Sequence, residues 1–216
     1  MYIILLGAPG SGKGTQAEKI RVYYKIPHIS TGDIFRREIK KDPKGAKGIA
    51  DLINAGRLAP DEVVIKMVKA RLAQEDCKDG ALLDGFPRTI AQAECLEGEC
   101  MTFAQKTVVI NLAAPRELLI KRVLGRRVCV ACSKNYNFDN YDSLDELAKK
   151  RCDCGGKLYN REDDNADIFL TRLEVYDEWT AQLIEYYGNK GNLITVDGSL
   201  DADTVFENIK AALIND

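Results

Sequence analysis

Residues 2–15, YIILLGAPGSGKGT, predict a buried strand, a glycine-rich turn and the first turn of a helix. Glycines allow the backbone to approach an anion and to direct successive N–H groups at it, while the following helix presents its positive N-terminus. Lys13 adds a mobile positive charge. The strict phosphate-binding motif, GxxxxGK[ST], has a hydroxyl residue directly after the lysine. Here Gly14 takes that place and Thr15 follows. The stretch therefore predicts a phosphate-binding loop and a nucleotide site.

The rest of the chain alternates short apolar runs with helical patterns. The apolar runs lie at residues 2–6, 28–30, 81–83, 107–112 and 193–196, and the longest helical pattern covers residues 164–187. This alternation predicts an α/β fold, with a parallel five-stranded sheet and helices on both faces. Two segments interrupt it: a purely helical insert at 30–59 and a cysteine-containing insert at 126–162. Ligands in such folds bind beyond the carboxyl ends of the strands, where the loop, Asp84 and Asn111 are expected.

The composition is that of an ordinary globular chain. Its 216 residues carry a formal net charge of −2, so a broad nucleic-acid-binding surface is not expected. No apolar run is long enough to cross a membrane, and no signal-peptide pattern opens the chain. We therefore expect a cytoplasmic protein without a nucleic-acid or membrane partner. The lack of a repeated apolar surface stripe favours a monomer.

Charged residues beside the predicted turns favour phosphoryl transfer. Asp84 follows a buried strand, where nucleotide-binding enzymes place the carboxylate that orients Mg²⁺ and its waters. Gly85 comes next, rather than a glutamate or glutamine able to activate water, which favours a bound acceptor over hydrolysis. His28 is the only histidine and is interpreted as structural, so Ser-His and Cys-His hydrolases lose support. Guanidinium groups suit the binding of several phosphates, and the candidates are Arg36, Arg88, Arg126, Arg127, Arg161 and Arg172.

Five motifs, in this order, resemble the adenylate kinase family over nearly the whole chain. They are GAPGSGKGT at 7–15, ISTGDIFR at 29–36, LLDGFPRT at 82–89, GRR at 125–127 and REDD at 161–164. The glycine after the loop lysine is the family's own variant. The resemblance implies the reaction Mg-ATP + AMP ⇌ 2 ADP. It also implies a core at 1–29, 60–125 and 164–216, an AMP-binding insert at 30–59, and a lid at 126–163 that closes over ATP.

The resemblance also implies a role for individual residues. The loop, with Gly10, Ser11, Gly12, Lys13, Gly14 and Thr15, should bind the ATP phosphates. AMP should be held by Thr31, Arg36, Arg57, Gly85, Arg88 and Gln92, and the Gln92 amide should bind the adenine edge. Arg126 and Arg161 would meet the phosphates from the lid, and Arg172 from the long helix. Asp84 would orient Mg²⁺, and Asp163 would hold the closed lid through an arginine.

Four of the seven cysteines form two tight pairs, which in a reducing compartment predict metal ligands. They are Cys129, Cys132, Cys152 and Cys154. The pairs resemble the zinc-binding form of the family's lid, which implies structural Zn²⁺. The second pair is one residue shorter than the usual CxxC, so the fourth ligand is either Cys152 or Asp153. Disulfides or a site that no longer binds metal are the alternatives.

The sequence alone leaves three other functions open. A GTP:AMP phosphotransferase would share the AMP motifs and differ in the donor-base pocket. Uridylate or cytidylate kinases fit less well, because Thr31 and Gln92 match the family's adenine-binding positions. A zinc-ribbon binding protein would use the cysteine segment for a partner, but that segment lies inside the catalytic frame.

Overall fold

The computed structural model describes residues 1–100, 106–137, 151–161 and 163–215. Part of the predicted lid, 138–150 and 162, therefore lies outside the described residues. Within the described ranges, no helix combines the length and the apolar character that crossing a bilayer requires.

A five-stranded parallel sheet forms the centre of the fold, as predicted, in the order β2-β3-β1-β4-β8. β1 pairs with β3 on one side, where Leu5 is opposite Asp84, and with β4 on the other, where Leu6 is opposite Asn111. This register places the ends of three strands beside the phosphate-binding loop. The strands are β1 (Tyr2–Leu6), β2 (His28–Ser30), β3 (Ala81–Asp84), β4 (Thr107–Ala113) and β8 (Leu193–Asp197).

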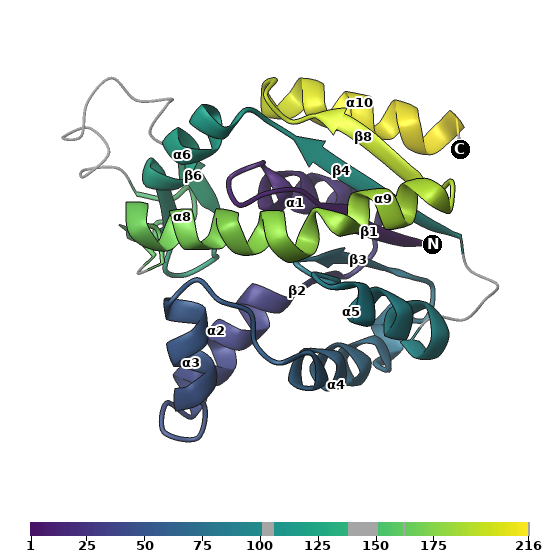
Figure 1. The fold of residues 1–216 in the computed structure, drawn as a ribbon. Helices are drawn as coiled ribbons and strands as arrows, with labels where there is room; N and C mark the ends of the chain where they lie inside the picture. The colour runs from purple at the N-terminus through teal and green to yellow at the C-terminus, as the bar shows by residue number, and fades with distance from the viewer. Residues whose placement is uncertain (101–105, 138–150, 162, 216) are drawn as a thin grey trace.

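Helices cover both faces of the sheet, because side chains alternate along each strand. Ile4 belongs to a core with residues of α4 (Asp61–Leu72), α5 (Ile90–Cys95) and α9 (Gln182–Asn189). Ile3 belongs to the opposite core, with α1 (Lys13–Tyr24) and α10 (Ala202–Asn215). Figure 1 shows α1 and α10 on one side of the sheet and α4 and α5 on the other. The connections are completed by η1 (Glu75–Cys77), η2 (Leu96–Cys100) and α6 (Arg116–Leu124).

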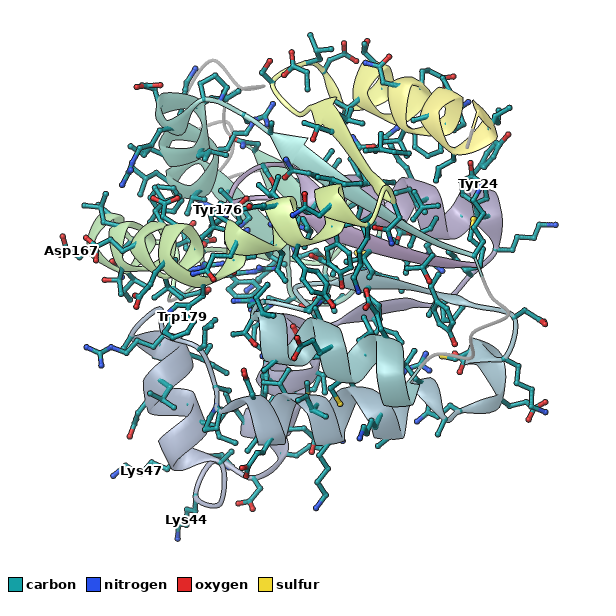
Figure 2. The ribbon with its side chains drawn as sticks, turned by 45° about the vertical axis from the view of Figure 1, so that its right-hand side comes forward. Tyr24, Lys44, Lys47, Asp167, Tyr176 and Trp179 are labelled. Carbon is teal, nitrogen blue, oxygen red and sulfur yellow. The ribbon has the colours of Figure 1, made fainter. Side chains whose placement is uncertain are left out.

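The predicted helical insert contains two helices, α2 (Thr31–Lys41) and α3 (Lys47–Asn54). The Ser30 side chain caps α2 by accepting from the Asp33 N–H at 3.4 Å. Thr31 is thus the first residue of the helix, and its hydroxyl donates to the Gly85 carbonyl instead of capping the helix. Figure 2 shows Lys44 and Lys47 at the far tip of this hairpin, pointing away from the sheet. Both helices of the hairpin contribute to the core, because Phe35 of α2 is buried there and Ile49 and Ile53 of α3 pack against it.

The cysteine segment forms a small antiparallel sheet in the order β6-β5-β7. Its strands are β5 (Arg126–Cys129), β6 (Asn135–Asn137) and β7 (Leu158–Tyr159). The β5–β6 pairing places Arg126 opposite Asn137 and Val128 opposite Asn135. This sheet reaches the phosphate-binding loop, because a Cβ on Gly14 would lie 3.4 Å from Asn135 Nδ2.

The predicted helix over 164–187 is a rod of three segments. It begins at α8 (Ala166–Val175), continues through the π-helical turn η4 (Tyr176–Thr180) and ends with α9. Asn165 caps its start by accepting from the Ile168 N–H at 2.9 Å. A π-turn inserts an extra residue into a helix and turns the following side chains. Here it directs the buried hydroxyl of Thr180 at the Arg88 carbonyl, 3.1 Å away.

Candidate active site

The phosphate-binding loop joins β1 to α1 in a backbone conformation that requires glycine. Gly10 has φ +87°, and a Cβ there would lie 2.7 Å from the Leu119 carbonyl oxygen. Lys13 folds back over the loop, and its Nζ donates to the carbonyls of Gly7 at 2.7 Å and Ala8 at 3.0 Å. The chain therefore forms the predicted loop, with the lysine ammonium held at its centre.

Burial lowers the pKa of Lys13 to about 8. The Asp84 carboxylate opposes this shift, whereas the positive charges of Arg88, Arg172 and Arg126 strengthen it. These three arginines come from the turn after β3, from α8 and from the small sheet. Cations from separate parts of the chain thus converge on the loop lysine. Such crowding of positive charge is typical of a site that binds several phosphates.

Asp84 ends β3 beside Lys13, and the residue interpreted as structural, His28, lies next to it. His28 Nε2 is 3.5 Å from Asp84 Oδ2, close enough for a charge pair whenever the imidazole is protonated. Burial favours the neutral acid, but the combined effect of His28, Lys13 and Arg88 holds the pKa of Asp84 below its usual value. Asp84 is therefore an ionised carboxylate at the mouth of the loop. Sequence reasoning assigned no role at this position to His28.

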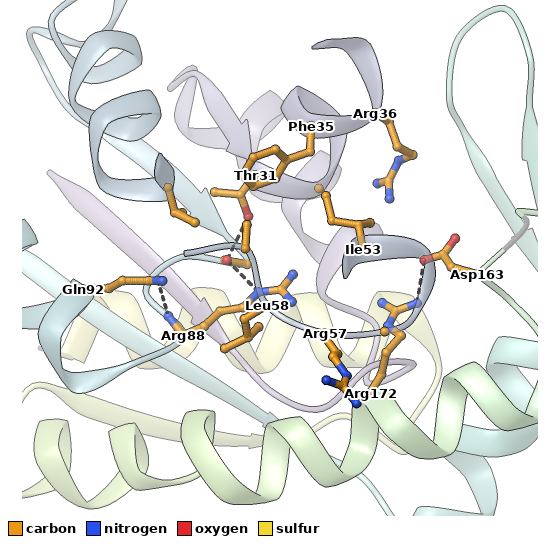
Figure 3. Close-up of a pocket in the computed structure, with 15 residues that line it drawn as sticks. Thr31, Phe35, Arg36, Ile53, Arg57, Leu58, Arg88, Gln92, Asp163 and Arg172 are labelled. Atoms are coloured by element: carbon orange, nitrogen blue, oxygen red, sulfur yellow. Dashed lines mark hydrogen bonds and ion pairs between the residues drawn. The ribbon is translucent and has the colours of Figure 1, made fainter. Parts of the chain in front are cut away.

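A pocket lies between the helical hairpin and the turn after β3 (Figure 3). Its wall is partly apolar, with Phe35, Ile53 and Leu58, and partly cationic. All of the residues predicted to hold AMP line it: Thr31, Arg36, Arg57, Gly85, Arg88 and Gln92. Asp163 and Arg172 complete its wall on the side of α8. The structure thus brings together residues more than fifty positions apart in the sequence.

Hydrogen bonds to the main chain fix the turn that carries Arg88. The Gly85 carbonyl accepts from Thr31 Oγ1 at 2.8 Å and from Arg88 Nε at 2.9 Å. The Arg88 N–H donates to Gln92 Oε1 at 2.8 Å, as Figure 3 shows. With the bond from Thr180, both polar main-chain groups of Arg88 are held by side chains. The guanidinium is thereby anchored to a rigid base.

Two more arginines of the predicted set are paired with neighbouring aspartates. Arg172 Nη1 lies 2.8 Å from Asp163 Oδ2, and Arg126 Nε lies 2.7 Å from Asp164 Oδ2. Sequence reasoning singled out Asp163 and missed Asp164, whose side chain is 1% exposed. Only the spacing of the REDD motif hinted at a second partner.

Arg161 is near enough to Arg126 and Arg36 to feel their charges, and its Nη2 donates to Asn135 Oδ1 at 3.5 Å. Burial, with the nearby charges of Arg126 and Arg36, lowers its pKa to about 10. Burial also lowers the pKa of Arg172 to about 10, although Asp163 partly offsets this. Bound anions would relieve this crowding of positive charge. The two guanidiniums are therefore suited to a polyanionic ligand.

The paired cysteines come together in the small sheet. The sulfurs of Cys129, Cys132, Cys152 and Cys154 all lie within 4.8 Å of one another. The Cys129–Cys154 and Cys132–Cys152 separations are 3.5 and 3.4 Å, far beyond a disulfide bond of about 2.05 Å. Four thiolates bound to zinc at about 2.3 Å would be about 3.8 Å apart. The donor set therefore fits a tetrahedral zinc site.

Of the two candidates for the fourth ligand, Cys152 is the one in this cluster. The Tyr136 hydroxyl donates to Cys152 Sγ at 3.3 Å. The Asp153 carboxylate instead binds Lys134 Nζ at 2.5 Å, on the exposed side of the segment. The CxC pair lies in a tight turn, in which the Gly155 N–H donates to the Cys152 carbonyl at 2.7 Å. The turn, rather than an extended strand, brings both sulfurs to the same cluster.

Comparisons with known proteins agree with this geometry. A sequence model of the family described as adenylate kinase matches residues 5–192. An adenylate kinase of Clostridium tetani is 49% identical over 216 residues, which covers 99% of this chain and 98% of that protein. The adenylate kinase of Caldicellulosiruptor saccharolyticus is also 49% identical, over 98% of each chain. That of Methanosarcina mazei is 44% identical, over 99% of this chain and 98% of its own. The chain belongs to the adenylate kinase family.

Proposed function

We propose that the protein transfers the terminal phosphoryl group of Mg-ATP reversibly to AMP, giving two molecules of ADP. The observation that carries this proposal is that three arginines converge on Lys13. They come from the turn after β3, from α8 and from the small sheet. A donor phosphate chain in the loop and an acceptor phosphate beside Arg88 would then meet within one cationic cage. Phosphoryl transfer requires positioning and charge stabilisation rather than a covalent intermediate.

Each part of the site has a separate task in this proposal. The loop from Gly10 to Thr15 binds the ATP phosphates through its backbone N–H groups, and Lys13 follows the transferred group. Thr31, Arg36, Arg57, Gly85 and Arg88 hold AMP, and Gln92 binds its base. Arg126, Arg161 and Arg172 neutralise charge that develops on the transferred oxygens. Asp84 would orient Mg²⁺ through its waters, and the ion would supply further positive charge at the phosphates.

The Asp163–Arg172 ion pair supports a role for Asp163 in lid closure, because it joins the end of the predicted lid to α8. The lid would also hold Zn²⁺ through Cys129, Cys132, Cys152 and Cys154, as a structural staple. This small sheet buries few apolar side chains, Val128 among them, so a metal would contribute much of its stability. We further propose that the protein is a cytoplasmic monomer, and light scattering after size-exclusion chromatography would test its oligomeric state.

Turnover with a panel of acceptors tests the proposal. ATP would be offered with AMP, CMP, UMP and GMP in turn, and the panel repeated with GTP as donor. We expect ATP with AMP to give the highest kcat/KM. Faster turnover with GTP would identify a GTP:AMP phosphotransferase, and inactivity with AMP under both donors would contradict the proposal. A protein without kinase activity that bound a partner through the cysteine segment would support the zinc-ribbon alternative.

A further inference from the structure

The side-chain amide of Gln92 has two partners of opposite kind. Its Oε1 accepts from the Arg88 N–H at 2.8 Å, and its Nε2 donates to Asp61 Oδ1 at 2.6 Å. The side chain is 1% exposed, so these protein partners replace water. Asp61 is the first residue of α4 and one of two acids in its first turn, and it was not among the site residues predicted from the sequence.

These two partners fix the direction of the amide. A backbone N–H can only donate, and a carboxylate can only accept. Turning the amide over would place its NH₂ against the Arg88 N–H and its oxygen against the Asp61 carboxylate. Both bonds would be lost and replaced by repulsion inside a buried site. The oxygen and the nitrogen of Gln92 therefore have defined positions.

Asp61 is itself anchored, so it can impose this direction. Its second oxygen accepts from Thr89 Oγ1 at 2.8 Å. The same Thr89 oxygen caps α5 by accepting from the Gln92 N–H at 3.2 Å. The N-terminus of α4 also favours a negative charge at this position. Asp61 thus connects the start of α4 to the start of α5 through Thr89 and Gln92, and Gln92 lines the pocket.

We propose that Asp61 is a positioning residue that determines the acceptor base by fixing the direction of the Gln92 amide. This rests on the proposed function, in which Gln92 faces the base of AMP. A carboxamide has two acceptor sites and two hydrogens, so one of each remains after Arg88 and Asp61 are bound. Adenine offers a donating amino group beside an accepting ring nitrogen, and hypoxanthine and guanine offer the reverse order. A fixed amide matches one order and opposes the other.

The test compares AMP with inosine monophosphate, which reverses the donor and acceptor on the same edge of the base. We expect Asp61→Ala to lower the AMP:IMP ratio of kcat/KM about tenfold, equivalent to ~1.4 kcal/mol. Asp61→Ser should do the same with less risk to folding, because serine is well tolerated at a helix start. Asp61→Asn should keep the ratio within about threefold, since its oxygen still accepts and the Thr89 hydroxyl can turn to accept its NH₂.

Glu62→Ala is the matched control, because it also removes an acid from the first turn of α4 but alters an exposed side chain. Its ratio should stay within about twofold of the parent's, as expected for an exposed surface substitution. A merely structural role of Asp61 would lower turnover with both acceptors alike and leave the ratio unchanged. An unchanged ratio in the Ala and Ser variants, or an equal change in the control, would overturn the proposal. Inactivity of the parent protein with AMP would instead contradict the proposed function.

Discussion

The lowered pKa of Lys13 predicts that nucleotide binding takes up a proton. In the free protein this pKa is about 8, mainly because the ammonium is buried, with added repulsion from Arg88, Arg172 and Arg126. At pH 8 the side chain is therefore about half neutral. Phosphates placed against it favour the charged form and raise the pKa. Binding of Mg-ATP at pH 8 should then take up about half a proton, and uptake should shrink as the pH is lowered toward 6.

Calorimetric titration in buffers of different ionisation enthalpy would measure this uptake. The sign follows from linkage: the bound state holds more protons, so affinity falls as pH rises above about 8. If only the charged lysine binds, the loss approaches about tenfold per pH unit. Lys13→Arg is the control, because a guanidinium stays charged throughout and the titration of ATP itself is common to both proteins. Equal uptake by both proteins, or proton release by the parent, would refute the reasoning.

Three further predictions concern other parts of the site. Arg88→Ala and Lys13→Ala should each lower kcat at least about a hundredfold. The circular dichroism spectrum should stay normal, which shows that the fold survives. Near-normal rates would contradict the roles assigned to these two residues. Cys152→Ser should lower the zinc content and the melting temperature of the lid, whereas Asp153→Ala should change neither. Metal analysis and thermal melts with and without a chelator would measure both effects. A melting temperature that does not change with chelator would argue against zinc. Thr180→Val removes the hydroxyl that holds the Arg88 carbonyl and should raise KM for AMP about two- to tenfold. Thr171→Val, on the same rod, should leave KM unchanged, and an equal rise in both would contradict this positioning role.

The predicted sheet and loop could be recognised because their signals are local. Each short apolar run can be recognised within a few positions of the sequence, and so can the glycine pattern of residues 7–15 and the pairing of the cysteines. The partner of Gln92 could not be predicted in this way. Asp61 lies 31 residues before it, and only the packing of α4 against α5 brings the two together. Contacts of this kind depend on tertiary structure rather than on spacing.

The choice between neighbouring side chains was also beyond the sequence. Nothing in the REDD motif distinguishes the aspartate that pairs with Arg126 from the one that pairs with Arg172, because the answer depends on where the chain enters α8. The π-turn at Tyr176–Thr180 was hidden for a different reason. The predicted helix covers the correct residues, but apolar spacing over a single turn does not distinguish a π-turn from an α-turn.

The rod from α8 to α9 fixes the spacing between two contacts of the site. Arg172 and Thr180 lie eight positions apart on it, and they reach the acceptor pocket and the Arg88 carbonyl, respectively. One inserted residue between them would advance the helix by about 1.5 Å and rotate everything beyond it by about 100°. Leu170 and Trp179 are 43% and 46% exposed, so their identities are free to drift during evolution. The number of residues between the two contacts is constrained, so insertions that other surface helices tolerate would be selected against here.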